Sequence, residues 1–205
     1  SVDGEWSVIG LSRAGLLSDE VAQRYEITAE DYVKQADSGR LDRAKSTENS
    51  RTILGLTAAG YNAADVAGVD LTSGLSDMNY LRIQGLNGPI WALIALDCHS
   101  YDIPQCAEGR EQTTREGLVA EILTSQCSDG GWTLAGDTAD VDMTAMALTA
   151  LAAYKDDAEV KAAVDAALVY LSDAQQEDGG FMSWGTANSE SCAQVIVALT
   201  ALGID

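Results

Sequence analysis

The chain of 205 residues is long enough to bury a substantial core in one sizeable domain, and its 46% hydrophobic content excludes wholesale disorder. It is strongly acidic, since 32 Asp and Glu against 12 Lys and Arg give a formal net charge of −20. Such a charge repels phosphate backbones and anionic lipid headgroups, which excludes nucleic acid and membrane surfaces as favoured partners. No apolar run approaches the ~20 residues of a membrane-spanning helix, so we expect no membrane insertion.

The residue types predict helices along the whole chain, because there are two prolines and the β-branched residues do not alternate with polar ones. Five segments are apolar enough to be largely buried helices, namely 5–15, 49–60, 88–98, 140–153 and 190–202. Between them lie polar or amphipathic segments: a helix that starts at Ser18, one over 113–125 and one over 157–176.

An internal repeat underlies this alternation. Gln126–Trp132 and Gln175–Phe181 share a Gln-x-x-Asp-Gly-Gly-aromatic pattern and start 49 residues apart, while Glu5–Gly15 matches Ser50–Gly60 at an offset of 45. Helical hairpins of this period either stack into an open solenoid or close into a ring. Small residues on the buried helices favour the ring, so we expect an all-α, α/α toroid of about five hairpins, with an inner and an outer helix layer.

The pattern Gln-x-x-x-Gly-x-Trp/Phe resembles the repeat of the terpenoid cyclase and protein prenyltransferase superfamily. The resemblance implies a toroid of about six hairpins, so residues 1–205 are expected to form a single toroid domain that ends before the ring closes. In that superfamily the motif braces neighbouring helices and does not contact substrate. The α-barrel of the vitamin B12 carriers is similar in type.

The stretch Asn188–Gly203 resembles secreted or surface-anchored proteins of Gram-positive bacteria that carry this toroid. This second resemblance implies an extracellular or cell-surface location and a chain that is a fragment of a longer surface protein.

Asp140-Val-Asp142 resembles the acidic motif of squalene–hopene-type cyclases, in which Asp142 would match the acid that protonates an alkene. Met143 stands where that family has a neighbouring Asp, and 6% aromatic residues build a carbocation cavity poorly. The other interpretation is that Asp140 and Asp142 cap a helix, in which case backbone N–H bonds to Asp142 would lower the pKa of its carboxylate. We expect Asp142 to be structural.

Neither a metal nor a cofactor is expected. His99 follows Asp97 and Cys98, and three consecutive side chains cannot converge on one zinc ion. The acids of 137–142 lack the Gly and terminal Glu of a calcium loop. Cys98 and Cys106 bracket a short loop, so we expect a disulfide between them if the protein is exported.

The starts of the five buried helices carry acids, amides and tryptophans. If all inner helices of a ring run the same way, these starts meet at one mouth, where they suit a polar ligand such as a glycan or a peptide. The alternative is that they serve capping and solubility alone. The candidate ligand-binding residues are Glu5, Trp6, Glu48, Asn49, Arg51, Asn87, Trp91, Asp140, Asp142, Trp184, Glu190 and Gln194.

Three functions remain open from the sequence. The first, which we favour, is a non-catalytic extracellular binding or adhesion module with a polar ligand at the mouth. The second is a cyclase-like or prenyltransferase-like enzyme with Asp142 as general acid. The third is a carrier of a corrinoid-type cofactor, which no residue specifically selects.

Overall fold

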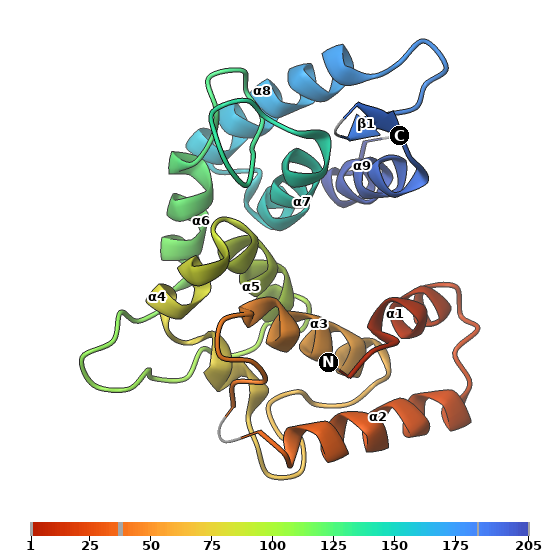
Figure 1. Cartoon of the computed structure of the whole chain (residues 1–205), viewed down its shortest axis with the longest axis vertical. Helices are drawn as coiled ribbons and strands as arrows, with labels where there is room; N and C mark the ends of the chain where they lie inside the picture. Colours follow the sequence, from red (N-terminus) through yellow and green to blue (C-terminus); the bar gives the residue numbers. More distant parts are fainter. Residues whose placement is uncertain (1, 37–38, 184, 205) are drawn as a thin grey trace. The chain divides into compact units, whose positions relative to one another are not determined.

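The computed structural model of the chain describes residues 2–36, 39–183 and 185–204 (Figure 1). These residues are mostly helical and their one sheet is a two-stranded hairpin, which confirms the predicted helical class. In the described ranges, no helix is both long and apolar enough to cross a bilayer. The chain divides into two compact units: unit 1 takes in residues up to 84 and 91–115, and unit 2 takes in 85–90 and everything after 115.

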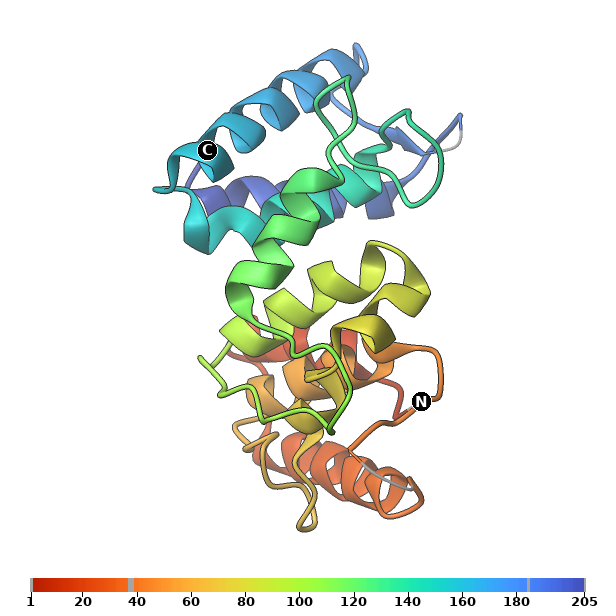
Figure 2. The same ribbon diagram turned by 90° about the vertical axis from the view of Figure 1, so that its left-hand side faces the viewer.

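Unit 1 is built from three longer helices joined by short turns of helix. Its elements are α1 (Glu5–Arg13), α2 (Asp19–Val33), α3 (Ser46–Ala58), η1 (Leu71–Leu75), α4 (Met78–Leu81), η2 (Arg82–Gln84) and the later part of α5 (Asn87–Asp97). α1 packs against α3, and α2 contacts both of them; Figures 1 and 2 show α2 along one side of this pair. Two expected inner helices thus share one outer helix.

Unit 2 repeats this arrangement. It comprises the first turn of α5, α6 (Arg115–Thr124, from its second residue), α7 (Val141–Leu151), η3 (Ala152–Tyr154), α8 (Ala158–Ala174), β1 (Met182–Ser183), β2 (Thr186–Ala187) and α9 (Ser189–Leu202). α7 packs against α9, and α8 packs against α7 (Figure 2). Each unit therefore contains a packed pair of expected inner helices, α1 with α3 and α7 with α9, and an amphipathic helix packs against at least one member of the pair.

The two copies of the sequence repeat in unit 1 end in the same backbone conformation. Gly15 and Gly60 follow α1 and α3 with φ of +67° and +89°, the left-handed conformation that glycine adopts without a steric penalty. The N–H of the next residue, Leu16 or Tyr61, donates to the carbonyl five residues earlier at 2.8 or 2.9 Å. This 6→1 bond satisfies a carbonyl that a helix end would otherwise leave free.

The Gln-to-aromatic motif of unit 2 ties helices together. The amide Nε2 of Gln126 donates to the carbonyls of Gly130 (2.7 Å) and of Ala163 on α8 (2.8 Å). Trp132 is fully buried, and its Nε1 donates to the carbonyl of Ile122 on α6 (2.7 Å). The motif therefore braces α6 and α8 in this unit, and Trp132 fills the space between elements as the sequence predicts.

The second copy of the motif has the same turn with fewer long-range bonds. Gly130 and Gly179 both have positive φ, +94° and +82°, and Phe181 is buried like Trp132. The amide Nε2 of Gln175, however, donates only to the nearby carbonyl of Gly179 at 3.0 Å, in an exposed position. The two copies thus share a local conformation and differ in their long-range contacts.

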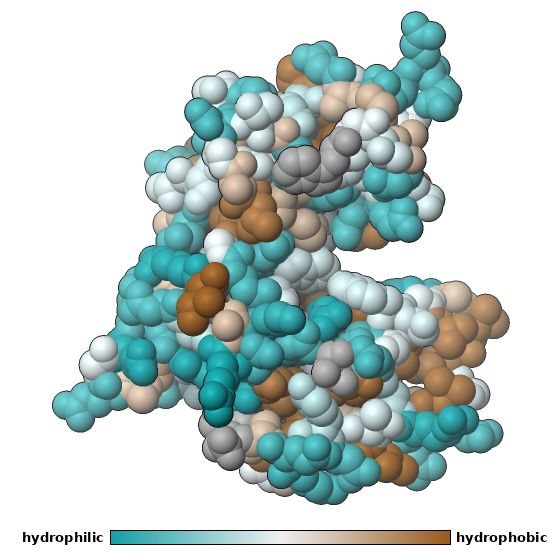
Figure 3. Space-filling model, viewed as in Figure 1, coloured by the Kyte–Doolittle hydropathy of each residue, from teal (hydrophilic) through white to brown (hydrophobic). Residues whose placement is uncertain are grey.

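Apolar side chains also gather on the surface of unit 1, where α1 passes into α2 (Figure 3). Leu16 is 71% exposed there, and Leu11 and Val21 are also exposed. α1 itself buries only Glu5 and Val8. The expectation that segment 5–15 forms a largely buried helix is therefore correct for the helix and wrong for its burial.

Candidate functional site

Two tryptophans that the sequence assigns to the starts of different helices meet in unit 1. The rings of Trp6 on α1 and Trp91 on α5 lie edge to face, with centroids 5.4 Å apart and planes at 61°. This is a favoured geometry for an aromatic pair. Trp6 remains 51% exposed, so the pair presents an aromatic surface to solvent.

Unit 1 also contains a group of buried and half-buried polar side chains that begins next to Trp6 in the sequence. We call it the buried charged cluster and define it as Glu5, Tyr25, Glu48 and Arg51. Glu5 directly precedes Trp6 and is only 2% exposed, and its Oε1 has no hydrogen-bond partner in the described structure. Burial raises the pKa of Tyr25, and the charge of Glu5 raises it further, while Arg51 lowers it. These couplings indicate that the side chains of three helices converge.

Glycine at position 55 makes this convergence possible. A Cβ atom at Gly55 would overlap the hydroxyl and ring of Tyr25, so the close approach of α2 to α3 requires glycine. The Tyr25 hydroxyl is itself buried without a hydrogen-bond partner.

Glu48 and Arg51 form the ion pair of the buried charged cluster. Arg51 Nη2 lies 2.6 Å from Glu48 Oε1, one helical turn apart on α3. Arg51 Nε and Glu48 Oε2 are buried with no partner, although the two side chains keep 27% and 13% of their surface exposed. Buried polar atoms are normally hydrogen-bonded, so this cluster has unused capacity to donate and accept.

Asn49 has a different role from its neighbours. It is fully buried, and its Oδ1 accepts from the backbone N–H of Leu41 at 2.9 Å. Its Nδ2 donates to the carbonyls of Leu71 (2.9 Å) and Gly39. The amide is fully used in holding two loops, so the structure assigns Asn49 to the fold of unit 1 and leaves none of its polar atoms for a ligand.

The two acids at the start of α7 are not equivalent. Asp140 is the N-cap, and its Oδ1 accepts from the N–H of Met143 at 2.8 Å. Asp142 lies in the first turn and has one buried carboxylate oxygen without a partner. The expectation that both acids cap the helix is therefore correct for Asp140 and wrong for Asp142.

The pKa of the Asp140 carboxyl is raised in spite of its cap bond. Burial raises the pKa of Asp140, and the charge of Asp142 adds to this, whereas the bond from the Met143 N–H lowers it. Desolvation is the largest of these effects, and together with the negative charge of the nearby Asp142 it outweighs the cap bond.

The remaining candidate residues are spread over unit 2. Asn87 lies in the first turn of α5, and Glu190 and Gln194 lie on α9, with Glu190 exposed. Trp184 lies outside the described residues. The candidates thus fall into one set in each unit, and both the tryptophan pair and the buried charged cluster belong to unit 1, where Glu5 and Trp6 are consecutive residues.

The four cysteines are free thiols. Cys98 Sγ donates to the carbonyl of Ala95 at 3.2 Å, and Cys106 Sγ donates to that of Arg110 at 3.6 Å. The expected disulfide between Cys98 and Cys106 is thus absent from the structure, because each thiol is directed to a carbonyl of its own segment.

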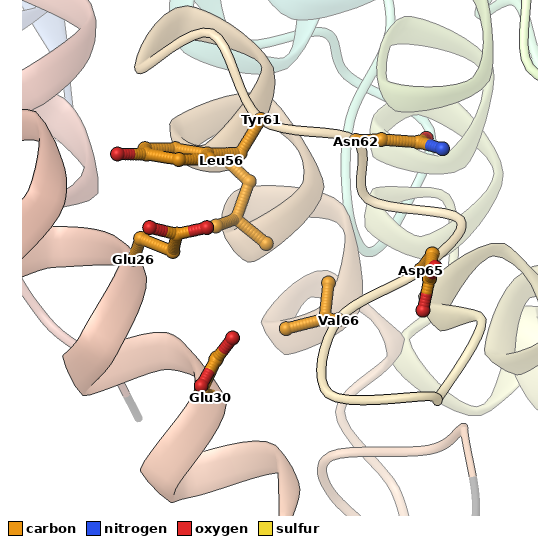
Figure 4. A pocket seen from close by; sticks show the side chains of 7 residues that line it. All are labelled: Glu26, Glu30, Leu56, Tyr61, Asn62, Asp65 and Val66. Atoms are coloured by element: carbon orange, nitrogen blue, oxygen red, sulfur yellow. The ribbon is translucent and has the colours of Figure 1, made fainter.

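A hollow in unit 1 lies between α2 and the loop after α3 (Figure 4). It is lined by Glu26 and Glu30 of α2, by Leu56 of α3, and by Tyr61, Asn62, Asp65 and Val66 of the loop. Its volume is about 40 Å³, room for water but not for a sugar ring. Within the described ranges, no group of three or more His, Cys, Asp or Glu side chains is arranged to hold a metal ion.

Tyr25 is the member of the site that the sequence does not reveal. It lies on α2 in a stripe with Ala22, Ala29 and Val33, and such spacing is typical of an ordinary core position. Its coupling to Glu5 and Arg51 depends on the packing of three helices, which no local pattern encodes.

No protein-family model matches the chain, and no match is found among curated proteins or solved structures.

Proposed function

We propose that the chain is a non-catalytic binding or adhesion module that takes a polar ligand, a glycan or a peptide, at the tryptophan pair of unit 1. In this proposal the exposed face of Trp6 stacks on an apolar face of the ligand, as aromatic rings do at sites that are apolar on one side and wet on the other. Arg51 and Glu48 reach the surface and supply hydrogen bonds.

The observation that carries this proposal is the exposed ring of Trp6 directly after Glu5, whose buried carboxylate oxygen has no partner among the described residues. Trp6 alone would be an ordinary exposed residue. Glu5 and Arg51, however, have buried polar atoms without partners, and leaving such atoms unpaired costs about 1–3 kcal/mol each. Sites that bind ligands combine apolar lining with a few such polar groups.

We also propose that the two units belong to one α/α toroid, and that it is extracellular or at the cell surface, the location resting on the resemblance of Asn188–Gly203 alone. The support is the paired inner helices with an outer helix in each unit, together with the repeated turns after α1 and α3.

Arrays of glycans and of peptides, followed by calorimetric titration of any hit, test the binding proposal. Trp6→Ala should weaken binding about tenfold or more, as truncation of a central aromatic does at interfaces. The matched control is Leu16→Ala, which removes a similarly exposed apolar side chain from the same unit. Absence of any hit on both arrays, or equal effects of the two substitutions, would overturn the proposal.

A cyclase-like enzyme is the second candidate, and the buried, unpartnered oxygen of Asp142 favours it. Incubation with squalene and shorter polyprenyl substrates tests it. A cyclised product that disappears in Asp142→Asn would replace the binding module by the enzyme. A corrinoid absorbance titration tests the carrier function in the same way.

A further inference from the structure

Unit 2 contains a cavity of about 310 Å³ that is independent of the tryptophan pair. It lies between the start of α7, the end of α8 and the β1–β2 hairpin, and its polar lining comes from Asp140, Tyr170, Gln176 and Ser183. Ala174 and Met182 add apolar surface. This volume is at the lower end of the range of small-molecule sites, so a ligand of about one sugar ring or one amino-acid side chain fits it.

The hydrogen-bonding groups of this cavity are mainly acceptors. Tyr170 donates its hydroxyl hydrogen to the carbonyl of Ala139 at 2.8 Å, so toward a ligand its oxygen can only accept. Gln176 uses one amide hydrogen on the carbonyl of Ala174 at 2.8 Å, which leaves its carbonyl oxygen available. The Asp140 carboxylate accepts the N–H of Met143 and also interacts with the Thr133 side chain and the Asp142 N–H, and a carboxylate has about four lone-pair sites, so acceptor capacity remains.

The charge that the described lining residues give this cavity is negative. The described residues that line the cavity include no Lys, Arg or His, whereas Asp140 lines it. The charges of Asp129 and Asp140 raise the pKa of Tyr170 after burial has done so, which shows that both acids act at this position. A carboxylate or phosphate would be repelled, and a cation is attracted both locally and by the net charge of −20.

We infer that the cavity lined by Asp140, Tyr170, Gln176 and Ser183 binds a primary ammonium group carried on a small body. An ammonium has three donors and no acceptor, which matches a lining of carboxylate, phenol and amide oxygens. The group could come from a lysine side chain or from a hexosamine, which share this chemistry.

Ligand-observed NMR titration of the whole chain distinguishes the two sources. The probes are glucosamine and N-acetylglucosamine in one arm, and Nα-acetyl-lysine amide and its Nε-acetylated form in the other. Each pair differs in the charge of one nitrogen. We expect saturable binding of at least one amine, and loss of binding on acetylation. Equal binding of the acetylated partners, or no saturable binding of either amine, would overturn the inference.

The variant Asp140→Asn keeps the helix cap, because Asn caps as well as Asp, and it removes the charge. It should weaken amine binding about tenfold or more, since hydrogen bonds to charged groups are the stronger ones. Asp156→Asn is the matched control, as it removes one exposed acid from the turn before α8. An equal loss in both variants would show charge attraction without a site and refute the inference.

A third variant tests whether the amine site of unit 2 is independent of the ligand site proposed for unit 1. Trp6→Ala, which should weaken the ligand of unit 1, should leave amine binding unchanged. A loss of amine binding in Trp6→Ala would contradict a separate site in unit 2.

Discussion

At the scale of single residues, the start of α7 shows two acids with opposite effects on stability. The cap bond of Asp140 is worth about 1 kcal/mol, as N-caps generally are. Asp142 has a favourable position near the helix dipole, worth about 0.3–1 kcal/mol, but its buried unpartnered oxygen costs about 1–3 kcal/mol. The cost of the unpartnered oxygen exceeds the gain from the helix dipole, so Asp142 adds nothing to the free energy of unfolding.

Urea denaturation of three variants checks this difference. Asp140→Ala should lower the free energy of unfolding by about 1 kcal/mol, and Asp140→Asn should lower it much less because the cap persists. Asp142→Ala should leave it unchanged or raise it. A larger loss in Asp142→Ala than in Asp140→Ala would mean that Asp142 has a partner or a packing role of its own.

Asp77 in unit 1 is a buried acid with abundant partners. Its side chain is 2% exposed, lies 2.7 Å from Arg40 Nη2, and caps α4. Burial alone would raise the pKa of Asp77, but the bonds from Arg40 and the Tyr80 N–H, with the charges of Arg40 and Arg110, hold it below the ordinary value. The folded state therefore binds its proton more weakly than the unfolded state does.

Because the pKa of Asp77 is lower in the folded state, the direction of the pH dependence of an Asp77→Asn variant follows. At neutral pH it should be less stable by about 2 kcal/mol, less than for a fully buried pair because Arg40 stays about one-third exposed. The difference from the wild type should be constant above the ordinary value of 3.8 and shrink as the pH falls through the lower folded pKa. Denaturation across this range measures it. Asp165→Asn, which removes an exposed pair with Lys161, should show almost no difference at any pH.

At the scale of elements, the two copies of the Gln-to-aromatic motif provide a matched experiment. Gln126→Ala removes bonds to Gly130 and Ala163 in a partly buried position and should cost about 1–3 kcal/mol. Gln175→Ala removes one exposed bond to Gly179 and should cost about 0.5 kcal/mol or less. Thermal or urea unfolding of the two variants measures both costs. Equal costs would show that the turn, and not the contact with α8, is what the glutamine stabilises.

Helix positions follow closely from the sequence where the local pattern is strong. The predicted starts at Ser18 and Asp157 are the N-caps of α2 and α8, because a short polar side chain before a periodic run satisfies the free N–H groups. The segments at η1 to η2 and the β1–β2 hairpin were not predicted. Elements of two to five residues are too short to show a hydrophobic period.

The sequence predicts only those parts of the candidate site that lie at helix starts, because the repeat places these starts at equivalent positions. That alignment placed Trp6 and Trp91 together, and the rings do meet. It could not separate Asn49 from Arg51, since the partners of Asn49 at Leu41 and Leu71 are fixed by loops that carry no repeat. The cavity at Asp140 likewise depends on Gln176 and Ser183, which tertiary packing alone brings to the start of α7.

At the scale of the whole molecule, the excess of acids is a destabilising term. With 32 acidic and 12 basic side chains, at least 20 acids have no basic side chain to neutralise them one to one. Like charges on the folded surface repel one another, and salt screens this repulsion with a Debye length of about 8 Å at 0.15 M. We expect the melting temperature to rise between about 10 mM and 0.15 M NaCl. A fall in melting temperature would mean that the attractive ion pairs outweigh the repulsion.

The edge-to-face contact of Trp6 and Trp91 has an optical consequence. Two indoles with centroids 5.4 Å apart and tilted planes couple their electronic transitions, which produces paired circular-dichroism bands of opposite sign in the far ultraviolet. The helices contribute far-ultraviolet bands of their own, so the difference spectrum between the wild type and Trp91→Phe is needed to isolate the indole couplet. Any molecule that stacks on the exposed ring of Trp6 and tilts it would change the couplet, which makes the chain a label-free reporter of its own occupancy.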